Sequence, residues 1–284
     1  MGAGKVGTTL ARLLNIRGYS VTTVYSRSHS HAELLAQQVK ARAVEMLSEI
    51  SSDLALLTVP DDAIQSTAEA LASAGYRGRA AAHTSGAHDA RALAALAEQG
   101  TAVGGLHPAY PFADVETAVK GLPGAAFAIE AQDDLLLGWL RDVVAALDGR
   151  ALIIPPGGKA LYHAALSMAS NYTVTLYAAA ESLLISLGAD QAVADQALNA
   201  LLAGTVENLR VQGVPDALTG PLVRSDTSTI AAHLRALGQV DEDLVEIYRQ
   251  LARLTYPLLR ARGIAPDEIE RLLQQEFEDA HHSP

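Results

Sequence analysis

Cysteine is absent from the 284 residues of this chain. That absence excludes disulfides, iron–sulfur clusters and zinc sites with thiolate ligands, and it is typical of proteins from a reducing compartment. Positive charge is scarce as well, because 21 lysines and arginines face 32 aspartates and glutamates and leave a net charge of −11. Proteins that follow nucleic-acid phosphates or an anionic membrane need a positive surface, so we expect neither partner. A small anion remains compatible with this charge, since one arginine or lysine can dominate a local site.

Charged residues are missing altogether from residues 160–180. A helix of that length could cross a membrane. The segment also contains the polar residues His163, Ser167, Ser170, Asn171, Thr173 and Thr175. We therefore expect a helix that is buried within protein. A charged segment followed by an apolar one, as in a signal peptide, is not seen at the amino end, and we expect a cytoplasmic protein.

Hydrophobic residues, by contrast, make up 49% of the chain, enough for a large core in one or two domains. In the first half, short β-like runs alternate with helical runs rich in alanine and leucine, which is typical of a parallel sheet covered on both faces. The predicted strands are 21–25, 54–59, 79–83, 101–106, 125–130 and 151–154, and the predicted helices are 8–16, 61–74, 90–99 and 134–146. After residue 158 only helices are predicted, at 159–187, 190–211, 227–237, 240–262 and 266–279. The sequence thus predicts a doubly wound α/β domain over 1–154 and an all-helical domain over 155–284.

Three glycines at the amino end, Gly2, Gly4 and Gly7, have the spacing of the dinucleotide-binding fingerprint. In that motif one glycine permits a tight turn, the second lets backbone N–H groups approach a pyrophosphate, and the third lets the helix pack closely against the sheet. The phosphate charge then lies at the helix N-terminus. A glycine-rich turn that binds nothing is the alternative. The strand that should precede Gly2 is missing from the sequence, and we expect about six mostly apolar residues upstream in the native product, from the usual length of a strand.

The end of the second strand indicates which dinucleotide is bound. An acid there would bind the ribose 2′-hydroxyl of NAD, but the chain has Arg27 between two serines. A guanidinium with flanking hydroxyls suits the 2′-phosphate of NADP, which is therefore the predicted cofactor, although Arg27 could also be a solvated loop residue. The predicted cofactor-binding residues are Gly2, Gly4, Lys5, Val6, Gly7, Ser26, Arg27, Ser28, Val59 and Pro60.

Candidate catalytic residues follow the ends of later strands. In an open parallel sheet, ligands bind at the carboxyl ends of the strands. Ser85 could donate a hydrogen bond to a substrate oxygen, and His107 could exchange a proton with a carbonyl or hydroxyl group as hydride moves. His83 and Thr84 are predicted to contact substrate. A histidine with a purely packing role is the alternative for each ring, and no spacing of histidines and acids indicates a metal site.

A polar stripe runs along the first predicted helix of the second half. Lys159, His163, Ser167 and Asn171 recur every four residues and so share one face. Buried polar groups need partners, so the stripe either lines a cleft that faces the nicotinamide or pairs with other protein groups at an interface. We favour the cleft and predict catalytic roles for Lys159, His163 and Asn171. Farther on, Thr219 and Arg224 could bind a substrate carboxylate, or their segment could be a capped turn between helices.

The same residues carry a family resemblance. The segments in question are Gly-Ala-Gly-Lys-Val-Gly at 2–7, Thr-Val-Pro-Asp-Asp at 58–62, His-Thr-Ser-Gly at 83–86, Leu-His-Pro at 106–108, His-Ala-Ala and Ala-Ser-Asn-Tyr within 163–172, and Ala-Leu-Thr-Gly-Pro at 217–221. Together they resemble the bacterial family with a Rossmann-like N-terminal domain and a DUF2520 C-terminal domain. The wider group includes pyrroline-5-carboxylate reductase, 6-phosphogluconate dehydrogenase and ketopantoate reductase. The resemblance implies NADP binding and an all-helical dimerising domain, but it does not name a substrate.

These observations lead to one functional hypothesis and two alternatives. We expect an NADP-dependent oxidoreductase that acts on a C=O or C=N group of a small anionic metabolite, or runs the reverse reaction, as a homodimer formed through the helical domain. Ser85 and His107 should face Lys159, His163 and Asn171 across one cleft. The alternatives are a dinucleotide-binding sensor or interaction protein without turnover, and an oxidoreductase that uses a deazaflavin together with NADP.

Overall fold

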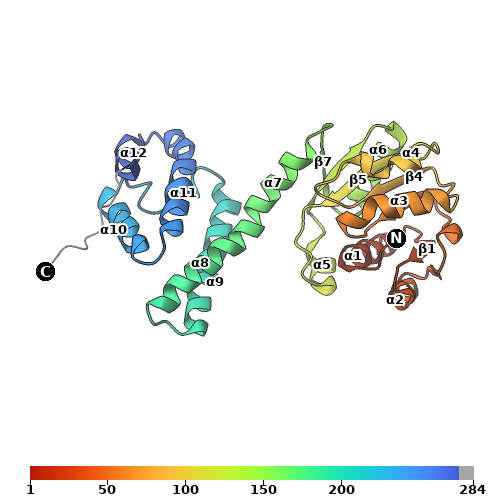
Figure 1. Ribbon diagram of the computed structural model, residues 1–284, viewed down its shortest axis with the longest axis horizontal. Helices are drawn as coiled ribbons and strands as arrows, with labels where there is room; N and C mark the ends of the chain where they lie inside the picture. Colours follow the sequence, from red (N-terminus) through yellow and green to blue (C-terminus); the bar gives the residue numbers. More distant parts are fainter. Residues whose placement is uncertain (275–284) are drawn as a thin grey trace. The chain divides into compact units, whose positions relative to one another are not determined.

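The computed structural model describes residues 1–274, which fall into two compact units, Met1–Leu176 and the residues from Tyr177 onward (Figure 1). The division lies within helix α8 (Asn171–Ser186), later in the chain than the predicted boundary after residue 154. The reason is that helix α7 (Lys159–Ala169) makes hydrogen bonds with the sheet of the first unit. Each unit is described separately below.

Two sheets form the centre of the first unit. The smaller pairs β1 (Thr23–Tyr25) with β2 (Arg42–Val44) in parallel. The larger has the order β3-β4-β5-β6-β7, with strands β3 (Leu54–Leu57), β4 (Ala80–His83), β5 (Ala102–Pro108), β6 (Ala126–Ala131) and β7 (Arg150–Ile153). The strands β3, β4 and β5 are parallel, whereas β6 runs antiparallel to β5 and β7 follows β6. The carboxyl ends of β3, β4 and β5 therefore lie at one edge.

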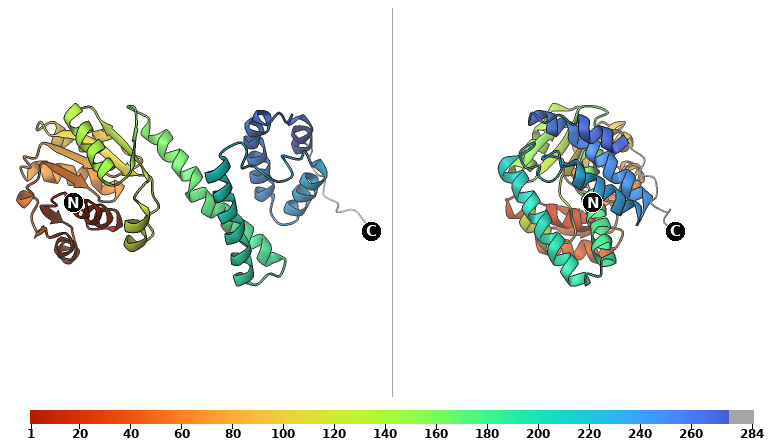
Figure 2. Two further views of the ribbon diagram at one scale, coloured as in Figure 1. Left: turned by 180° about the vertical axis from the view of Figure 1, so that it is seen from behind. Right: turned by 90° about the vertical axis from the view of Figure 1, so that its left-hand side faces the viewer.

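Helices cover both faces of the larger sheet. They are α1 (Lys5–Ile16), α2 (His29–Val39), α3 (Ile64–Ser73), α4 (Ala94–Ala97), α5 (Val115–Gly121) and α6 (Asp134–Ala146), with short 3-10 turns at Leu47–Glu49, Asp61–Ala63 and Ala90–Leu93. Side chains of α1 and α6 pack with Ala80 and Ala82 of β4, while α3 and α4 pack with Ala81. This alternation is the two-residue period of a strand with two buried faces. The predicted α/β class with a doubly wound, mainly parallel sheet is confirmed (Figure 2).

A gap separates the two sheets. In the described part of the chain no ladder joins β1 to β3, and a cavity of about 820 Å³ lies between them. At one end of the gap, the N–H of Gly2 donates to the carbonyl of Tyr25 after β1, and the nitrogen of Met1 donates to the carbonyl of Leu56 in β3. Elsewhere the smaller sheet is attached through α1 and α2, which contact each other.

The second unit is helical over the residues that the structure describes. It contains the latter part of α8 and the helices α9 (Gln191–Gln212), α10 (Thr227–Gly238), α11 (Glu242–Ala261) and α12 (Asp267–Gln274). Its core forms where Ile230 of α10, Leu259 of α11 and Ile269 of α12 are completely buried. The long helix predicted over 159–187 is interrupted at Ser170, and the part of the last predicted helix beyond residue 274 lies outside the described residues.

The expected burial of the uncharged segment within protein is not what the structure shows for most of its residues. Leu161, Met168, Tyr172 and Val174 are all more than half exposed. Among the described residues, no helix is both long enough and apolar enough to span a membrane.

Candidate active site

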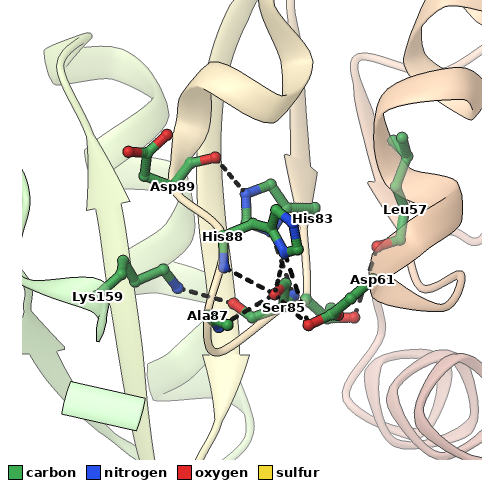
Figure 3. Close-up of polar contacts among 9 residues, drawn as sticks. Leu57, Asp61, His83, Ser85, Ala87, His88, Asp89 and Lys159 are labelled. Carbon is green, nitrogen blue, oxygen red and sulfur yellow. Dashed lines mark hydrogen bonds and ion pairs between the residues drawn. The ribbon is translucent and has the colours of Figure 1, made fainter. Parts of the chain in front are cut away.

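Hydrogen bonds connect the loops at the carboxyl edge of the larger sheet. The N–H of Thr84, just past β4, donates to the carbonyl of Leu57 at the end of β3, at 3.1 Å. The hydroxyl of Ser85 donates to Oδ2 of Asp61, which follows β3, at 2.8 Å (Figure 3). Thr58 extends the same network to the glycine-rich turn, because its hydroxyl donates to the carbonyl of Gly2 at 2.8 Å. The strand-end rule thus places these loops side by side.

The three positions of the turn differ in why each one holds a glycine. Gly2 has a φ of +93°, and a Cβ there would lie 2.7 Å from the carbonyl oxygen of Thr58. A Cβ at Gly7 would lie 2.1 Å from the carbonyl oxygen of Gly2, so both positions require glycine for packing. Gly4 differs, since a Cβ there would meet nothing within 4 Å. The backbone at Gly4 therefore faces open space, as the approach of a ligand would require.

The first turn of α1 is free of acidic residues, and its N-cap, Gly4, has no capping side chain. The N–H groups of that turn and the positive end of the helix dipole consequently favour an anion. Arg27 is exposed after β1, between the half-buried serines Ser26 and Ser28. The other predicted cofactor contacts lie at the same edge, with Lys5 exposed in the first turn and Val6 half-buried behind it, Val59 half-buried and Pro60 exposed just after β3.

Ser85 is buried, and its hydroxyl makes hydrogen bonds within its own loop and with Asp61. Besides donating to Asp61, Oγ accepts the N–H groups of Ala87 at 3.1 Å and His88 at 3.0 Å. Nδ1 of His88 lies 3.3 Å from the same oxygen. Ser85 therefore organises the loop after β4 in this structure (Figure 3). Its predicted contact with a substrate oxygen would require Asp61 to give way, and that contact stays a prediction.

His83 is completely buried at the end of β4. Its Nε2–H donates to the carbonyl of Asp89 at 3.0 Å, and its Nδ1 accepts the N–H of Ser85 at 3.2 Å. The two partners fix the neutral tautomer with the proton on Nε2. Burial lowers the pKa of His83 to about 4. Because both ring nitrogens are engaged, neither is available for the predicted substrate contact, and the half-buried Thr84 next to it already donates its N–H to Leu57.

His107, near the end of β5, has a polar partner on α7. Its Nδ1 lies 2.8 Å from the hydroxyl of Tyr162, and the two rings meet edge to face. Burial, with smaller contributions from Lys159 and His163, lowers the pKa of His107 to about 4. Burial raises the pKa of Tyr162 to about 12. The imidazole is therefore neutral and the phenol protonated at physiological pH.

Lys159 is buried at the start of α7. Its Nζ donates to the backbone carbonyl of Ser85 at 2.8 Å (Figure 3), and it lies 3.5 Å from where a Cβ would be at Gly105. Burial lowers the pKa of Lys159, while Glu130, Asp61 and Asp89 act in the opposite direction. Glu130 stands opposite Gly105 in the β5–β6 pair, so its side chain shares that face of the sheet.

The remaining residues of the polar stripe diverge. His163 is exposed, its ring centre is 6.4 Å from that of His107, and a Cβ at Gly86 would lie only 2.7 Å from His163 Cδ2. Asn171 is exposed and begins α8 after the interruption at Ser170. The structure thus brings together His107, Lys159, His163 and the backbone of Ser85, all within the first unit. It gives Asn171 no contact with them, so its predicted role is untested.

Thr219 and Arg224 are both exposed in the second unit. The segment that carries them ends in Asp226, whose carboxylate accepts the N–H of Thr229 and caps α10. Hydrogen bonds from Thr229 and Ser228 lower the pKa of Asp226 to about 2. The capped turn between helices is therefore present, and binding of a substrate carboxylate by Arg224 stays a prediction.

Two residues of the site were missed by sequence reasoning. Tyr162 neighbours His163 on the helix but lies outside the four-residue stripe, and only its contact with His107 marks it. Glu130 is the one acid of its predicted strand, and its Oε2 is buried without a hydrogen-bond partner. An acid in an otherwise apolar strand is the signal that could have found it.

Comparison with known proteins agrees with this architecture. Residues 1–108 match the family model of the Rossmann-like domain, and residues 125–255 match that of DUF2520, a domain of unknown function. No curated protein sequence matches the chain.

Solved structures extend the likeness over most of the chain. A provisionally named NADP oxidoreductase from Bacteroides fragilis is 25% identical over 89% of this chain and 94% of its own, with a TM-score of 0.68. Protein TM1727 from Thermotoga maritima is 22% identical over 92% and 98%, with a TM-score of 0.78. An imine reductase from Myxococcus stipitatus, solved in complex with NADP+, is 21% identical over 92% of both chains, with a TM-score of 0.56. The chain therefore contains a Rossmann-like region at 1–108 and a DUF2520 region at 125–255, and its fold is shared with solved structures named as an NADP oxidoreductase and an imine reductase.

Proposed function

We propose that the protein is an NADP-dependent oxidoreductase that transfers hydride to or from a carbon–oxygen or carbon–nitrogen group of a small anionic metabolite. The observation that carries this proposal is the neutral His107, held by Tyr162 and flanked by Lys159 and His163, at the sheet edge where the glycine-rich turn opens. Proton-transfer groups beside a dinucleotide site are what reduction of a polar double bond requires. The solved structures named as an NADP oxidoreductase and an imine reductase support the same class.

The residues present fit the cofactor. The backbone at Gly4 is open to solvent, the first turn of α1 offers N–H groups without a competing acid, and Arg27 is exposed. The pyrophosphate would bind at the first turn of α1, and the 2′-phosphate would bind at Arg27 with the hydroxyls of Ser26 and Ser28. When bound, NADP(H) supplies or accepts the hydride.

The chain's own residues would handle the proton. When Tyr162 donates its hydrogen to Nδ1 of His107, the imidazole carries its proton on Nε2, which faces Gly86 and the ring of His163. That N–H can donate its proton to the oxygen or nitrogen of a substrate while Nδ1 takes the hydroxyl proton of Tyr162, and the half-buried phenol is then protonated again by solvent. Lys159 contributes positive charge, which helps to keep His107 neutral and attracts an anionic substrate.

Cofactor preference tests the nucleotide site. Replacing Arg27 with alanine should weaken NADP binding by about 10- to 100-fold, the worth of hydrogen bonds to a charged group, and affect NAD binding little. Titration calorimetry with both dinucleotides measures the difference, and Arg141→Ala, which removes another exposed arginine, is the matched control. Equal losses for NADP and NAD would overturn the assignment of Arg27.

Turnover tests the reaction. Oxidation of NADPH should be detectable with a panel of small keto acids and cyclic imines, and His107→Ala should lower it by about 100-fold or more, the usual scale for a positioned proton-transfer group. Tight NADP binding without turnover on any member of the panel would favour the sensor instead.

A further inference from the structure

A buried positive charge lies near His107 without a carboxylate in contact with either. Lys159 is only 3% exposed, and its Nζ donates to the backbone carbonyl of Ser85 at 2.8 Å. Within residues 1–274, neither Lys159 nor His107 forms an ion pair with an acidic side chain. Carboxylates farther away still favour the charged form of the lysine. Solvent screens a buried charge much less than an exposed one, so this ammonium group acts strongly on its neighbours.

Asp61 is the acid that opposes Lys159 at His107, and it is poorly placed to cancel the positive charge. It follows β3, whereas His107 belongs to β5, and β4 lies between these two strands. Figure 3 shows Asp61 and Lys159 on opposite sides of the loop after β4. The side chain of Asp61 is 50% exposed, and its Oδ2 already accepts the hydroxyl of Ser85. Solvent therefore weakens the effect of this carboxylate.

His107 itself indicates how a cation is tolerated at this position. Burial, followed by the charges of Lys159 and His163, lowers its pKa to about 4 and outweighs the opposite effect of Asp61. The protonated imidazole is thus disfavoured here. A cationic group of a substrate beside the same ring would meet the same lysine in the same buried surroundings, and it would be disfavoured for the same reasons.

The two reactions considered above differ in the charge of the reacting group. Hydride adds to a C=N group in its protonated form, which is a cation, and the amine that results is a cation as well. Addition of hydride to a C=O group instead moves negative charge onto the oxygen, and a fixed positive charge nearby stabilises that oxygen. Lys159 therefore favours reduction of a C=O group and opposes reduction of a C=N group.

From this arrangement we propose that the substrate is a small keto acid and the product is the corresponding hydroxy acid, a specificity that rests on the oxidoreductase function proposed above. Hydride from NADPH adds to the carbonyl carbon, and the π electrons of the C=O bond move to the oxygen. That oxygen takes the proton from Nε2 of His107, while Nδ1 takes the hydroxyl proton of Tyr162, which solvent then replaces. NADPH is oxidised to NADP+, and the keto group is reduced to an alcohol.

Matched substrates test the choice of double bond. The keto acid α-ketovalerate and the cyclic imine pyrroline-2-carboxylate have the same number of carbon atoms and a carboxylate on the reacting carbon. The unmodified protein with NADPH should reduce the keto acid with a kcat/KM at least about tenfold higher, the effect of one pKa unit of charge discrimination. The comparison is repeated with the longer pair, α-ketocaproate and piperideine-2-carboxylate.

An added acid should shift this preference toward the imine. His163 is exposed, and its ring centre is 6.4 Å from that of His107. His163→Glu therefore places a carboxylate near the reacting group, and His163→Gln is the uncharged control of the same size. The rate with the imine relative to the rate with the keto acid should be at least about tenfold higher in His163→Glu than in His163→Gln. A general loss of activity cancels in this ratio.

Binding provides a readout that needs no turnover. The compounds α-hydroxyvalerate and norvaline differ only in having a neutral hydroxyl or a cationic ammonium group on the same carbon. Titration calorimetry in the presence of NADP+ should show α-hydroxyvalerate bound at least about tenfold more tightly by the unmodified protein. The difference should be smaller in His163→Glu than in His163→Gln.

The possible outcomes separate this inference from the function on which it rests. Faster reduction of the imine than of the keto acid in both pairs overturns the keto-acid assignment and leaves the oxidoreductase function standing. Equal ratios in His163→Glu and His163→Gln, or binding of norvaline as tight as that of α-hydroxyvalerate, also overturn the assignment. Oxidation of NADPH with neither class of substrate, in a protein that binds neither compound, overturns both proposals.

Discussion

His83 and Lys159 show how burial shifts the pKa of single residues. Both lie beside the loop after β4, and burial disfavours the charged form of each. For His83 the neutral ring makes both of its hydrogen bonds within the protein. For Lys159 three carboxylates oppose the effect of burial, so the pKa of this lysine depends on its acidic neighbours.

The pH dependence of stability should therefore contain a histidine contribution. The ordinary pKa of histidine is 6.5, and in the folded protein that of His83 is about 4. Between these values the unfolded chain binds a proton and the folded chain does not, so the free energy of unfolding falls as the pH decreases from 6.5 to 4. The difference of about 2.5 pKa units corresponds to on the order of 3 kcal/mol.

Urea unfolding at several pH values measures this dependence. In His83→Gln the amide can still donate to the carbonyl of Asp89 but cannot titrate, so the fall between pH 6.5 and 4 should be shallower than in the unmodified protein. His31→Gln, at an exposed histidine, is the control. The same slope in all three proteins would show that His83 is not responsible.

Glu130 should control the protonation of Lys159. Burial lowers the pKa of Lys159 and the Glu130 carboxylate opposes that effect, so Glu130→Gln should lower the pKa of Lys159 further. The chain has only four lysines, which makes the ε-carbon signals in NMR spectra simple to assign. Glu116→Gln, at an exposed acid paired with Arg12, serves as the control. An unchanged titration of Lys159 would contradict the coupling.

Prediction from sequence succeeded at residues whose role is local. The turn and packing roles of Gly2 and Gly7 follow from their spacing alone, and the structure gives each a close contact, whereas their contact with a cofactor stays a prediction. Tyr162 and Glu130 escaped because their roles depend on partners far away in the chain, such as His107 for Tyr162. A periodic pattern on one helix records which residues share a face, but not which strand that face meets.

At the scale of elements, the junction between α1 and β3 should be sensitive to a single methyl group. Gly7→Ala would place a Cβ against the backbone of Gly2, and overpacking of this kind costs about 1–3 kcal/mol. Gly4→Ala meets open space, so it should change stability by less and weaken NADP binding instead.

Urea unfolding and NADP titration on both variants separate the two effects. Gly138→Ala, a helical glycine with nothing within 4 Å of the added Cβ, is the neutral comparison. Similar stability losses at positions 4 and 7 would contradict the different roles assigned to these glycines.

Helices and strands with a clear pattern of apolar residues were predicted well from the sequence, and those with a weak pattern were missed. The runs that became β3, β4 and β5 end at prolines or polar loops, and α6 has a regular apolar face. The elements α2, β2 and α5 were not singled out, since each is short or weakly patterned. The antiparallel direction of β6 could not be predicted either, because it depends on pairing with β5 rather than on local sequence.

At the scale of the whole molecule, α9 lacks cover. Of its 22 residues only Ala194 is buried, and Leu201, Val206 and Val211 are each more than half exposed. An apolar surface of this extent is typical of an interface, so we expect two copies of the chain to associate through α9.

Light scattering at micromolar concentration should give twice the mass of the chain. Leu201→Asp should shift the protein toward the monomer, because a buried carboxylate without a partner opposes association. Val240→Asp, at an exposed valine in the turn between α10 and α11, is the control. A monomer for the unmodified protein would refute the expectation.

The separation of β1 from β3 also has a mechanical consequence. Arg27 follows β1 of the smaller sheet, whereas His107 belongs to β5 of the larger one, and no ladder joins the two sheets in the described residues. A dinucleotide that contacted both Arg27 and the His107 side of the site would connect the two sheets, which are otherwise linked by α1, α2 and the turn at Gly2. Part of the free energy of dinucleotide binding would then be used to fix the position of the smaller sheet relative to the larger one.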